Sequence, residues 1–190
     1  EILTCDWSSD VCSSDLESSY LLVFRDELTE LPARRALNQA LLTLGKRYTI
    51  AMVDIDHFKK FNDTYGHDVG DQLLRMVGFK LATLTGGGTA FRYGGEEFTL
   101  LFPGKLVDEA MPHIENVFRA IQSTPFTIRA PGPRRPPGGA DPKPERRERQ
   151  KVRVTVSIGV AAARMPNEVV ADADRALYRA KAEGRNRITR

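Results

Sequence analysis

The chain has 190 residues, of which 41% are hydrophobic and 28% are charged, and it carries a formal net charge of +3. This length suffices for one α/β domain with a full hydrophobic core. The sequence has no apolar run of the roughly 18–20 residues that a membrane span requires, and the stretch 20–24 is too short and lacks the basic flank of a signal peptide. We therefore expect a soluble chain.

The first 17 residues differ from the rest. They repeat the tripeptide Ser-Ser-Asp and contain both cysteines, Cys5 and Cys12, together with the only tryptophan, Trp7. This stretch resembles translated sequencing-adapter sequence. We expect residues 1–17 to be a non-native-looking or disordered segment, with the domain over 18–190.

A helix followed by a buried strand comes next. Apolar residues at helical spacing predict a helix over 32–44. The strand predicted over 48–54 is almost entirely apolar, which is typical of a strand covered on both faces. Because side chains alternate along a strand, Asp54 and Asp56 at its end share one face.

The segment after Asp56 begins a helix directly after a strand. Free backbone N–H groups at a helix start bind phosphate, and Phe58 and Lys59 are placed to offer such groups. This pattern indicates a phosphate contact.

Polar residues further along this segment suggest base recognition. Asn62 and Asp71 can hydrogen bond to a base, because a carboxylate facing N1–H and the 2-amino group of guanine forms two parallel bonds that adenine cannot offer. The alternative is that Asn62 caps a helix end, and that Asp68 or Asp71 caps the helix predicted over 68–84.

Residues 89–102 predict a β-hairpin with its two-residue turn at Gly94 and Gly95, since glycine takes positive φ without steric cost. Glu96 and Glu97 follow, and strand alternation places them on opposite faces, so that at least one can face the aspartates. Hard oxygen ligands at this density suit Mg²⁺. The alternative is ordinary solvated acidic residues beside a turn.

The remaining predicted elements are a helix over 107–123, strands over 126–129 and 152–161, and a helix over 167–183. Pro112 interrupts the first of these helices at a position suited to a first turn, and Gly184 stops the last one.

A low-complexity stretch at about 130–151 separates the two strands. Its seven basic and three acidic residues give it a net charge of +4, so the alkaline character of the chain comes from this stretch. Its proline and glycine content predicts a disordered insertion. The alternative is a basic tether to a membrane or RNA.

The motifs together resemble the GGDEF domain, the catalytic domain of diguanylate cyclases, in a GGEEF variant. The resemblance covers about 22–188, and its motifs occur in the family's order. They are Asp26-Glu27-Leu28-Thr29-Glu30-Leu31-Pro32, Asp54-Ile55-Asp56-His57-Phe58-Lys59, Asn62-Asp63, Gly66-His67, Gly70-Asp71, Gly94-Gly95-Glu96-Glu97-Phe98, Val154 to Val160, Asp174 to Lys181 and Gly184-Arg185-Asn186.

The resemblance implies a fold and a reaction. The fold is an α/β (α+β) sandwich with a mixed central sheet covered by helices, similar to the palm of nucleotidyl cyclases and polymerases. The reaction condenses two GTP molecules into cyclic di-GMP and two pyrophosphates, by attack of a 3′-hydroxyl on an α-phosphate. Each subunit of a homodimer would hold one GTP, with two metal ions, Mg²⁺ or Mn²⁺, per active site.

The resemblance also assigns roles to matching positions. It implies metal ligands at Asp54, Ile55 (through its carbonyl), Glu96 and Glu97, with Glu96 as the candidate base and Glu97 as its acidic neighbour. It implies substrate contacts at the amides of Phe58 and Lys59 and at Asn62, His67, Asp71, Lys181 and Arg185. For Lys181 and Arg185, the alternative is that basic residues favour helix C-termini through the macrodipole.

One motif of the family is absent. Many members carry Arg-x-x-Asp five residues before Gly-Gly, and this motif binds product and inhibits the enzyme. Here the corresponding residues are Thr85-Gly86-Gly87-Gly88, which offer neither a guanidinium nor a carboxylate. We therefore expect no high-affinity product inhibition through this site.

The resemblance further implies a cytoplasmic bacterial domain of a kind that can belong to a membrane-anchored full-length protein, and we expect an upstream sensory or dimerisation domain that is missing from this chain. We expect no nucleic-acid partner and no membrane contact from this segment. Two alternatives remain open: a catalytically silent GTP-binding regulatory GGDEF module, and a cyclase that makes mixed guanine–adenine dinucleotides, against which Asp71 argues.

Overall fold

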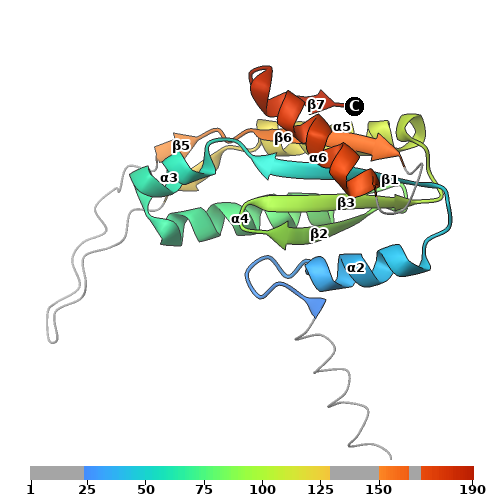
Figure 1. The fold of residues 1–190 in the computed structure, drawn as a ribbon. Coiled ribbons are helices and arrows are strands. Elements are labelled where there is room, and N and C mark those ends of the chain that lie inside the picture. The colour runs from blue at the N-terminus through green and yellow to red at the C-terminus, as the bar shows by residue number, and fades with distance from the viewer. Residues whose placement is uncertain (1–23, 129–149, 163–167) are drawn as a thin grey trace, which may run out of the picture.

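The structure, a computed structural model, describes residues 24–128, 150–162 and 168–190. Its central sheet has five strands in the order β2-β3-β1-β6-β7 (Figure 1). The strands are β1 (Tyr48–Ile55), β2 (Thr89–Gly94), β3 (Glu97–Pro103), β6 (Val156–Ala162) and β7 (Ile188–Thr189). All neighbours pair antiparallel except β6 and β7, which are parallel. The predicted mixed sheet is therefore confirmed.

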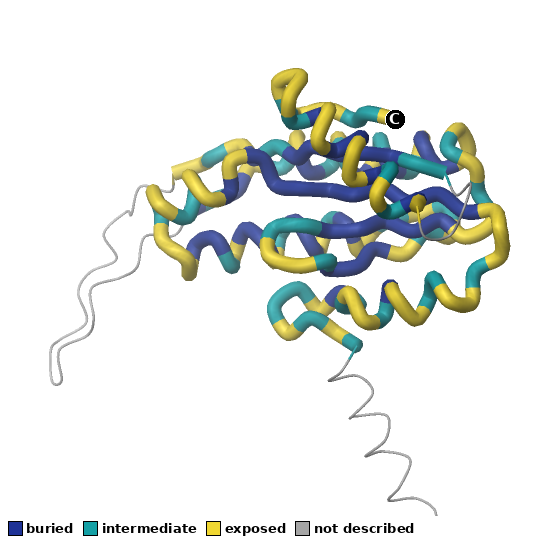
Figure 2. The backbone as a smooth tube through the Cα atoms, in the orientation of Figure 1, coloured by how far each residue is buried: buried dark blue, intermediate teal, exposed yellow. Residues whose placement is uncertain are grey.

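Helices cover both faces of this sheet. They are α2 (Arg34–Thr43), α3 (Phe58–Tyr65), α4 (His67–Ala82), α5 (Val107–Ser123) and α6 (Val169–Ala182). Strand β1 is buried along its whole length between the two helical layers, as Figure 2 shows. Alternation along this strand divides the core: Ile50 and Met52 belong to the cluster on the α2 and α6 face, whereas Ala51 and Val53 belong to the cluster on the α4 and α5 face.

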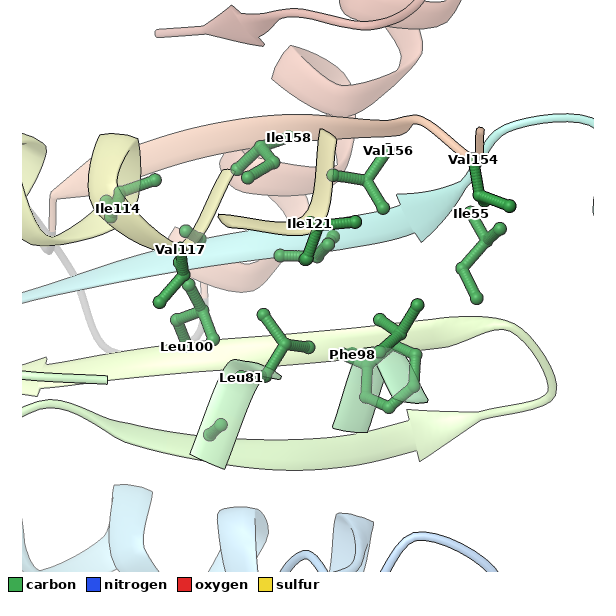
Figure 3. Close-up of a cluster of buried hydrophobic side chains, with 14 of the residues drawn as sticks. Ile55, Leu81, Phe98, Leu100, Ile114, Val117, Ile121, Val154, Val156 and Ile158 are labelled. Carbon is green, nitrogen blue, oxygen red and sulfur yellow. The ribbon is translucent and has the colours of Figure 1, made fainter. Parts of the chain in front are cut away.

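The α4 and α5 face carries the larger core cluster. Leu81 of α4 and Ile114, Val117 and Ile121 of α5 lie against the side chains of β3, among them Leu100 (Figure 3). Each of these five side chains is at least 97% buried, and burying a side chain of this size stabilises the fold by about 1.5–3 kcal/mol.

On the opposite face, α6 packs closely against β6. A Cβ atom at Gly159 would overlap backbone atoms of Ala173 and Leu177. The absence of a side chain at Gly159 therefore lets α6 approach the sheet directly. This approach determines where the last turn of α6, which carries Lys181, lies relative to the end of β1.

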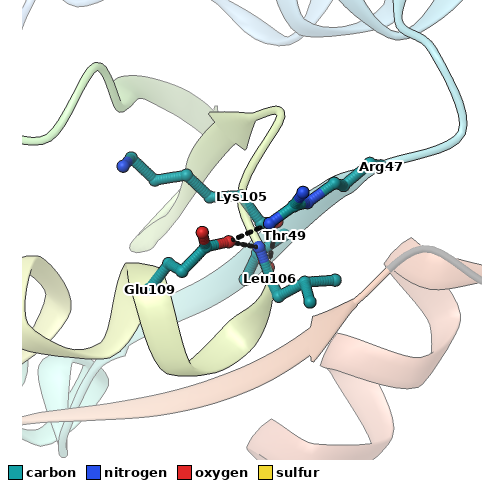
Figure 4. Close-up of polar contacts among 5 residues, drawn as sticks. All are labelled: Arg47, Thr49, Lys105, Leu106 and Glu109. Carbon is teal, nitrogen blue, oxygen red and sulfur yellow. Dashed lines mark hydrogen bonds and ion pairs between the residues drawn. The ribbon is translucent and has the colours of Figure 1, made fainter.

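At the start of β1, away from the acidic end, a polar group joins the strand to α5 (Figure 4). Glu109 accepts hydrogen bonds from Arg47 and from the backbone N–H of Leu106, both at 2.7 Å. The bond from Leu106 and the guanidinium of Arg47 lower the pKa of Glu109. Thr49 donates to the carbonyl of Lys105 at 2.9 Å. These contacts hold the N-terminus of α5.

The structure corrects several predicted boundaries. Helix α5 is continuous through Pro112, which lies in its second turn rather than its first, because the buried face of a long helix offsets the loss of one hydrogen bond. The strand predicted over 152–161 is divided into β5 (Gln150–Val152) and β6. Strand β5 pairs with β4 (Phe126–Ile128) in a separate two-stranded sheet. Gln150 and Lys151 therefore belong to a strand and not to the insertion.

Two predictions fall on residues that the structure does not describe. Residues 1–17 lie outside the described ranges, and so does the insertion up to residue 149. Among the described helices, none is long and apolar enough to cross a membrane.

Candidate active site

The candidate site lies at the C-terminal end of β1, on the α6 face of the sheet. Asp54 is 4% exposed and is the register partner of Glu97 on β3 and of Ser157 on β6. The Nζ atom of Lys181 lies 2.8 Å from Oδ2 of Asp54. Burial raises the pKa of Asp54, and the hydrogen bond and charge of Lys181 oppose this shift. The fold thus brings a buried carboxylate and a cation together.

The hairpin turn differs from the prediction. Strand β2 ends at Gly94, which is paired with Glu97, so the two turn residues are Gly95 and Glu96 rather than the two glycines. Gly95 supplies the positive φ of 49° that the turn requires. Strand alternation therefore applies to Glu97 but not to Glu96, so the argument that placed the two glutamates on opposite faces of one strand does not hold.

Both glutamates are close enough to Asp54 to sense its charge. Burial raises the pKa of Glu96 and of Glu97, and in each case the charge of Asp54 raises it further while Lys181 opposes the shift. The backbone N–H of Ile55 donates to the carbonyl of Glu96 at 3.4 Å, which ties the turn to the end of β1. Three carboxylates thus converge at one end of two neighbouring strands.

The predicted phosphate contacts lie directly beyond β1. Asp56 and His57 follow the strand, and α3 begins at Phe58. His57 takes a left-handed conformation with φ of 60°, which turns the chain sharply from strand into helix. The first amides of any helix lack intrahelical acceptors, so those of Phe58 and Lys59 are available at this end of the sheet. Lys59 is exposed, whereas Phe58 is buried.

The predicted base contacts lie on α3 and α4. Among the described residues, Oδ1 of Asn62 is buried and has no hydrogen-bond partner. A buried acceptor without a partner is costly, and ligand donors would satisfy it. Asp71 is half-buried on α4, and His67 is exposed at the first residue of that helix. Arg185, which follows α6, lies near enough to Asp54 for its charge to lower the pKa of that carboxyl against the effect of burial.

Sequence reasoning missed the role of Arg92. This arginine is 8% exposed, forms an ion pair with Asp26 at 3.5 Å and donates a hydrogen bond to the carbonyl of Gly95. Its guanidinium also lies 5.1 Å from the ring centroid of Phe98. Arg92 therefore connects the loop that precedes α2 to the turn that carries Glu96. The feature of the sequence that could have revealed this role is a single arginine within an apolar strand.

Two further charges influence Glu97. The charge of Asp174 on α6 adds to the burial that raises the pKa of Glu97, and the charge of Arg34 on α2 opposes it. The guanidinium of Arg34 lies 4.3 Å from the ring centroid of Tyr93 on β2. Neither residue had been predicted as part of the site, because their positions depend on how the two helices pack on the sheet.

The donor set fits a hard divalent cation. Asp54, Glu96 and Glu97 offer carboxylate oxygens. Burial raises the pKa of all three, and the charge of Asp54 raises the pKa of the two glutamates further, so a cation would stabilise their ionised forms. The described residues nevertheless contain no group of three or more His, Cys, Asp or Glu side chains arranged to hold a metal ion on their own. Mg²⁺ sites in proteins normally use one or two carboxylates and leave the remaining coordination to water and substrate phosphates.

The antiparallel core of β1, β3 and β6, with carboxylates at its end and helix starts beside them, defines a palm-like nucleotidyl cyclase domain. The family model described as "Diguanylate cyclase, GGDEF domain" matches residues 23–135 and 141–187. The chain therefore belongs to the GGDEF domain family of diguanylate cyclases, and the family assigned from the sequence motifs is confirmed.

Curated relatives agree with this assignment. The response regulator PleD of Caulobacter vibrioides is 34% identical over 192 residues, which covers 95% of this chain and 38% of PleD. Diguanylate cyclase VdcA of Vibrio cholerae is 37% identical over 171 residues, which covers 86% of this chain and 45% of VdcA. The chain thus spans less than half the length of these relatives.

Solved structures show the same fold. The coiled coil and GGDEF domain of DgcB from Caulobacter crescentus, in complex with c-di-GMP, superimposes with a TM-score of 0.78 at 29% identity, covering 95% of this chain and 92% of that one. Diguanylate cyclase SiaD of Pseudomonas aeruginosa, in complex with its activator SiaC, gives a TM-score of 0.74 at 31% identity, covering 95% and 68%.

Proposed function

We propose that this chain condenses two GTP molecules into cyclic di-GMP and two pyrophosphates, each GTP being held by one subunit of a homodimer. The observation that carries the proposal is the convergence of Asp54, Glu96 and Glu97 at one end of the sheet, with Lys181 bonded to Asp54. Relatives named as diguanylate cyclases, and a similar structure that contains c-di-GMP, support it.

Substrate binding uses residues on both sides of the acidic cluster. The amides of Phe58 and Lys59 bind the terminal phosphates, and Lys181 and Arg185 neutralise their charge. Asn62 and Asp71 recognise the guanine, with His67 beside the base. The unpaired, buried Oδ1 of Asn62 supports this role, because guanine N–H groups would supply the missing donor.

Two reciprocal chemical steps form the product. In each, the 3′-oxygen of one nucleotide bonds to the α-phosphorus of the other and the bond from that phosphorus to its leaving pyrophosphate breaks, so that the second step closes the ring. Glu96 accepts the proton of the 3′-hydroxyl, a role that its raised pKa favours. Asp54, the carbonyl of Ile55, Glu96 and Glu97 would hold Mg²⁺ or Mn²⁺, two ions per site. Such ions stabilise the attacking and leaving oxygens of an in-line displacement.

The proposal is tested by incubating the purified chain with GTP and Mg²⁺ over a range of protein concentrations and resolving the products by mass spectrometry. We expect cyclic di-GMP to form at a rate that rises steeply with protein concentration, since catalysis needs two subunits. Glu96→Gln should reduce the rate by at least about 100-fold.

A chain that binds GTP and Mg²⁺ tightly yet makes no product, even with a dimerising helix fused upstream, would contradict the proposal. That result would support the silent GTP-binding module instead. An ATP competition in the same assay separates a guanine-specific enzyme from one that makes mixed dinucleotides.

A further inference from the structure

We propose that Asp56 is a positioning residue for Arg185 and is not a metal ligand. The inference rests on the proposed function, because it assumes that Arg185 binds the terminal phosphates of GTP. Asp56 lies two residues beyond Asp54 and on the same side of the sheet, so proximity alone would make it a candidate ligand. Its hydrogen bonds indicate a different role.

Protein donors already engage both carboxylate oxygens of Asp56, which is 7% exposed. Thr155 donates its hydroxyl to Oδ2 and Ser157 donates its hydroxyl to Oδ1, both at 2.7 Å. The backbone N–H of Asn186 donates to Oδ2 at 3.0 Å. Asp54, in contrast, bonds to the flexible ammonium of Lys181. The two aspartates therefore differ in how far donors of the protein itself satisfy the hydrogen-bonding capacity of their carboxylate oxygens.

The third of these bonds holds an unusual turn. Arg185 and Asn186 both take left-handed conformations, with φ of 62° and 49°. This region is unfavourable for a side chain such as arginine, so the surrounding contacts must maintain it. The N–H of Arg185 donates to the carbonyl of Ala180 at 2.9 Å, and Oδ1 of Asn186 accepts from Gln122 of α5 at 3.1 Å.

Asp56 thus connects the end of β1 to the backbone immediately after Arg185. The turn is otherwise held from α6, α5, β6 and β7, none of which carries the metal ligands. By bonding to Asn186, the Asp56 carboxylate fixes the origin of the Arg185 side chain relative to Asp54. The resulting proximity agrees with the effect of Arg185 on Asp54, whose pKa burial raises and Arg185 lowers.

The test measures nucleotide affinity by calorimetry, with Mg²⁺, for two unreactive probes: a GTP analogue with an α,β-methylene bridge, and GMP, which lacks the terminal phosphates. We expect Asp56→Ala to weaken the binding of the triphosphate analogue by about tenfold and the binding of GMP by less than twofold. Arg185→Ala should do the same, and the double variant should bind no more weakly than Arg185→Ala alone.

Asp56→Asn provides the conservative rescue. Its amide oxygen can accept from Thr155 and Asn186 while its NH₂ group donates to the hydroxyl of Ser157, so the turn keeps its anchor without a negative charge. We expect it to bind the triphosphate analogue within about threefold of the unmodified chain. Asp54→Asn, which removes a proposed metal ligand, should instead abolish the dependence of that affinity on Mg²⁺.

Three results would overturn the inference. Asp56→Asn could behave like Asp54→Asn, Asp56→Ala could weaken the binding of GMP as much as that of the triphosphate analogue, or the effects of Asp56→Ala and Arg185→Ala could be additive.

If Asp56→Ala does not fold, Gln122→Ala loosens the same turn from its exposed side. It should weaken the binding of the triphosphate analogue two- to threefold without affecting the binding of GMP. A chain that binds the analogue but makes no cyclic di-GMP contradicts the proposed function while leaving this test intact.

Discussion

The ammonium group of Lys181 lies 2.8 Å from Oδ2 of Asp54, so a cation at the end of α6 neutralises a carboxylate at the end of β1. The Asp54 side chain is 6% exposed, whereas that of Lys181 is 33% exposed. The lysine can therefore move toward solvent while the aspartate stays in place. We expect a divalent cation to take over the neutralisation of Asp54 and to leave Lys181 for the phosphates of GTP.

Replacing Lys181 by methionine should lower kcat/KM for GTP by on the order of 10–100-fold, since a hydrogen bond to a charged group contributes about 1.5–3 kcal/mol. Steady-state kinetics at saturating Mg²⁺ would measure this loss. Lys80→Met is the matched control, because Lys80 lies in the last turn of α4, on the opposite face of the sheet. Equal rates for Lys181→Met and the unmodified chain would refute a phosphate contact.

Without divalent cations, Glu97→Gln should raise the melting temperature at pH 7 by on the order of 1–2 °C. Burial, followed by the charge of Asp54, raises the pKa of Glu97 above its ordinary value of 4.5 in the folded protein. The folded state therefore binds more protons than the unfolded chain between these two values, and stability falls as the pH rises through this window. The amide removes that cost.

Calorimetric melts of Glu97→Gln at pH 4 and pH 7, with and without MgCl₂, test this prediction. The gain should be present at pH 7 and absent near pH 4, where the carboxyl of the unmodified chain is protonated. Glu115→Gln on α5 is the control and should give no gain, because Glu115 forms an ion pair with Arg119 at 2.9 Å. A lower melting temperature for Glu97→Gln at pH 7 would contradict the argument.

Gly70→Ala should raise KM for GTP by roughly 3–10-fold, the range expected for one lost hydrogen bond. A Cβ atom at Gly70 would overlap Oδ1 of Asn62 and lie 2.9 Å from its Cγ atom. The amide of Asn62 must then move out of the position from which we propose that it contacts the base. Gly45→Ala serves as the control, since its Cβ would meet nothing within 4 Å. An unchanged KM for Gly70→Ala would argue against Asn62 as a base contact.

Cyclic di-GMP added to the turnover assay at submicromolar concentration should not inhibit the conversion of GTP. Thr85 bonds to Nδ1 of His113 at 2.8 Å, and neither it nor Gly88 offers a charged group. Inhibition below 1 μM that persists in a Thr85→Ala variant would show a product site elsewhere. Inhibition that disappears in the variant would show that this loop binds product after all.

The same loop resists conversion to the family's inhibitory motif. A Cβ atom at Gly88 would lie 2.5 Å from Cε1 of Phe102 and 2.7 Å from Cδ2 of Leu84. We expect Gly88→Asp to reduce the free energy of unfolding by about 1–3 kcal/mol, the usual cost of overpacking. Urea titration would measure the loss, and Thr85→Arg, at an exposed position, should cost less. A fully stable Gly88→Asp would show that the loop can rearrange.

Local sequence patterns predicted most elements of the fold. The helical spacing in α2, α4 and α6 and the unbroken apolar run of β1 are properties of adjacent residues, so their periodicity is visible without any tertiary contact. Local reasoning was wrong where geometry depends on pairing. The register of β2 with β3 moved the turn by one residue, to Gly95 and Glu96. That shift placed Glu96 outside the alternation of the strand.

The sequence by itself therefore determined the chemistry that is available: two aspartates at the end of an apolar strand, two glutamates at a turn and basic residues at the end of the last helix. Only the tertiary structure decided which of these groups meet. Lys181 reaches Asp54 because Gly159 lets α6 approach the sheet, and Asp56 bonds to Asn186 because β6 pairs with β1 on one side and with β7 on the other. Such contacts join residues far apart in the chain, and sheet order, not local periodicity, sets them.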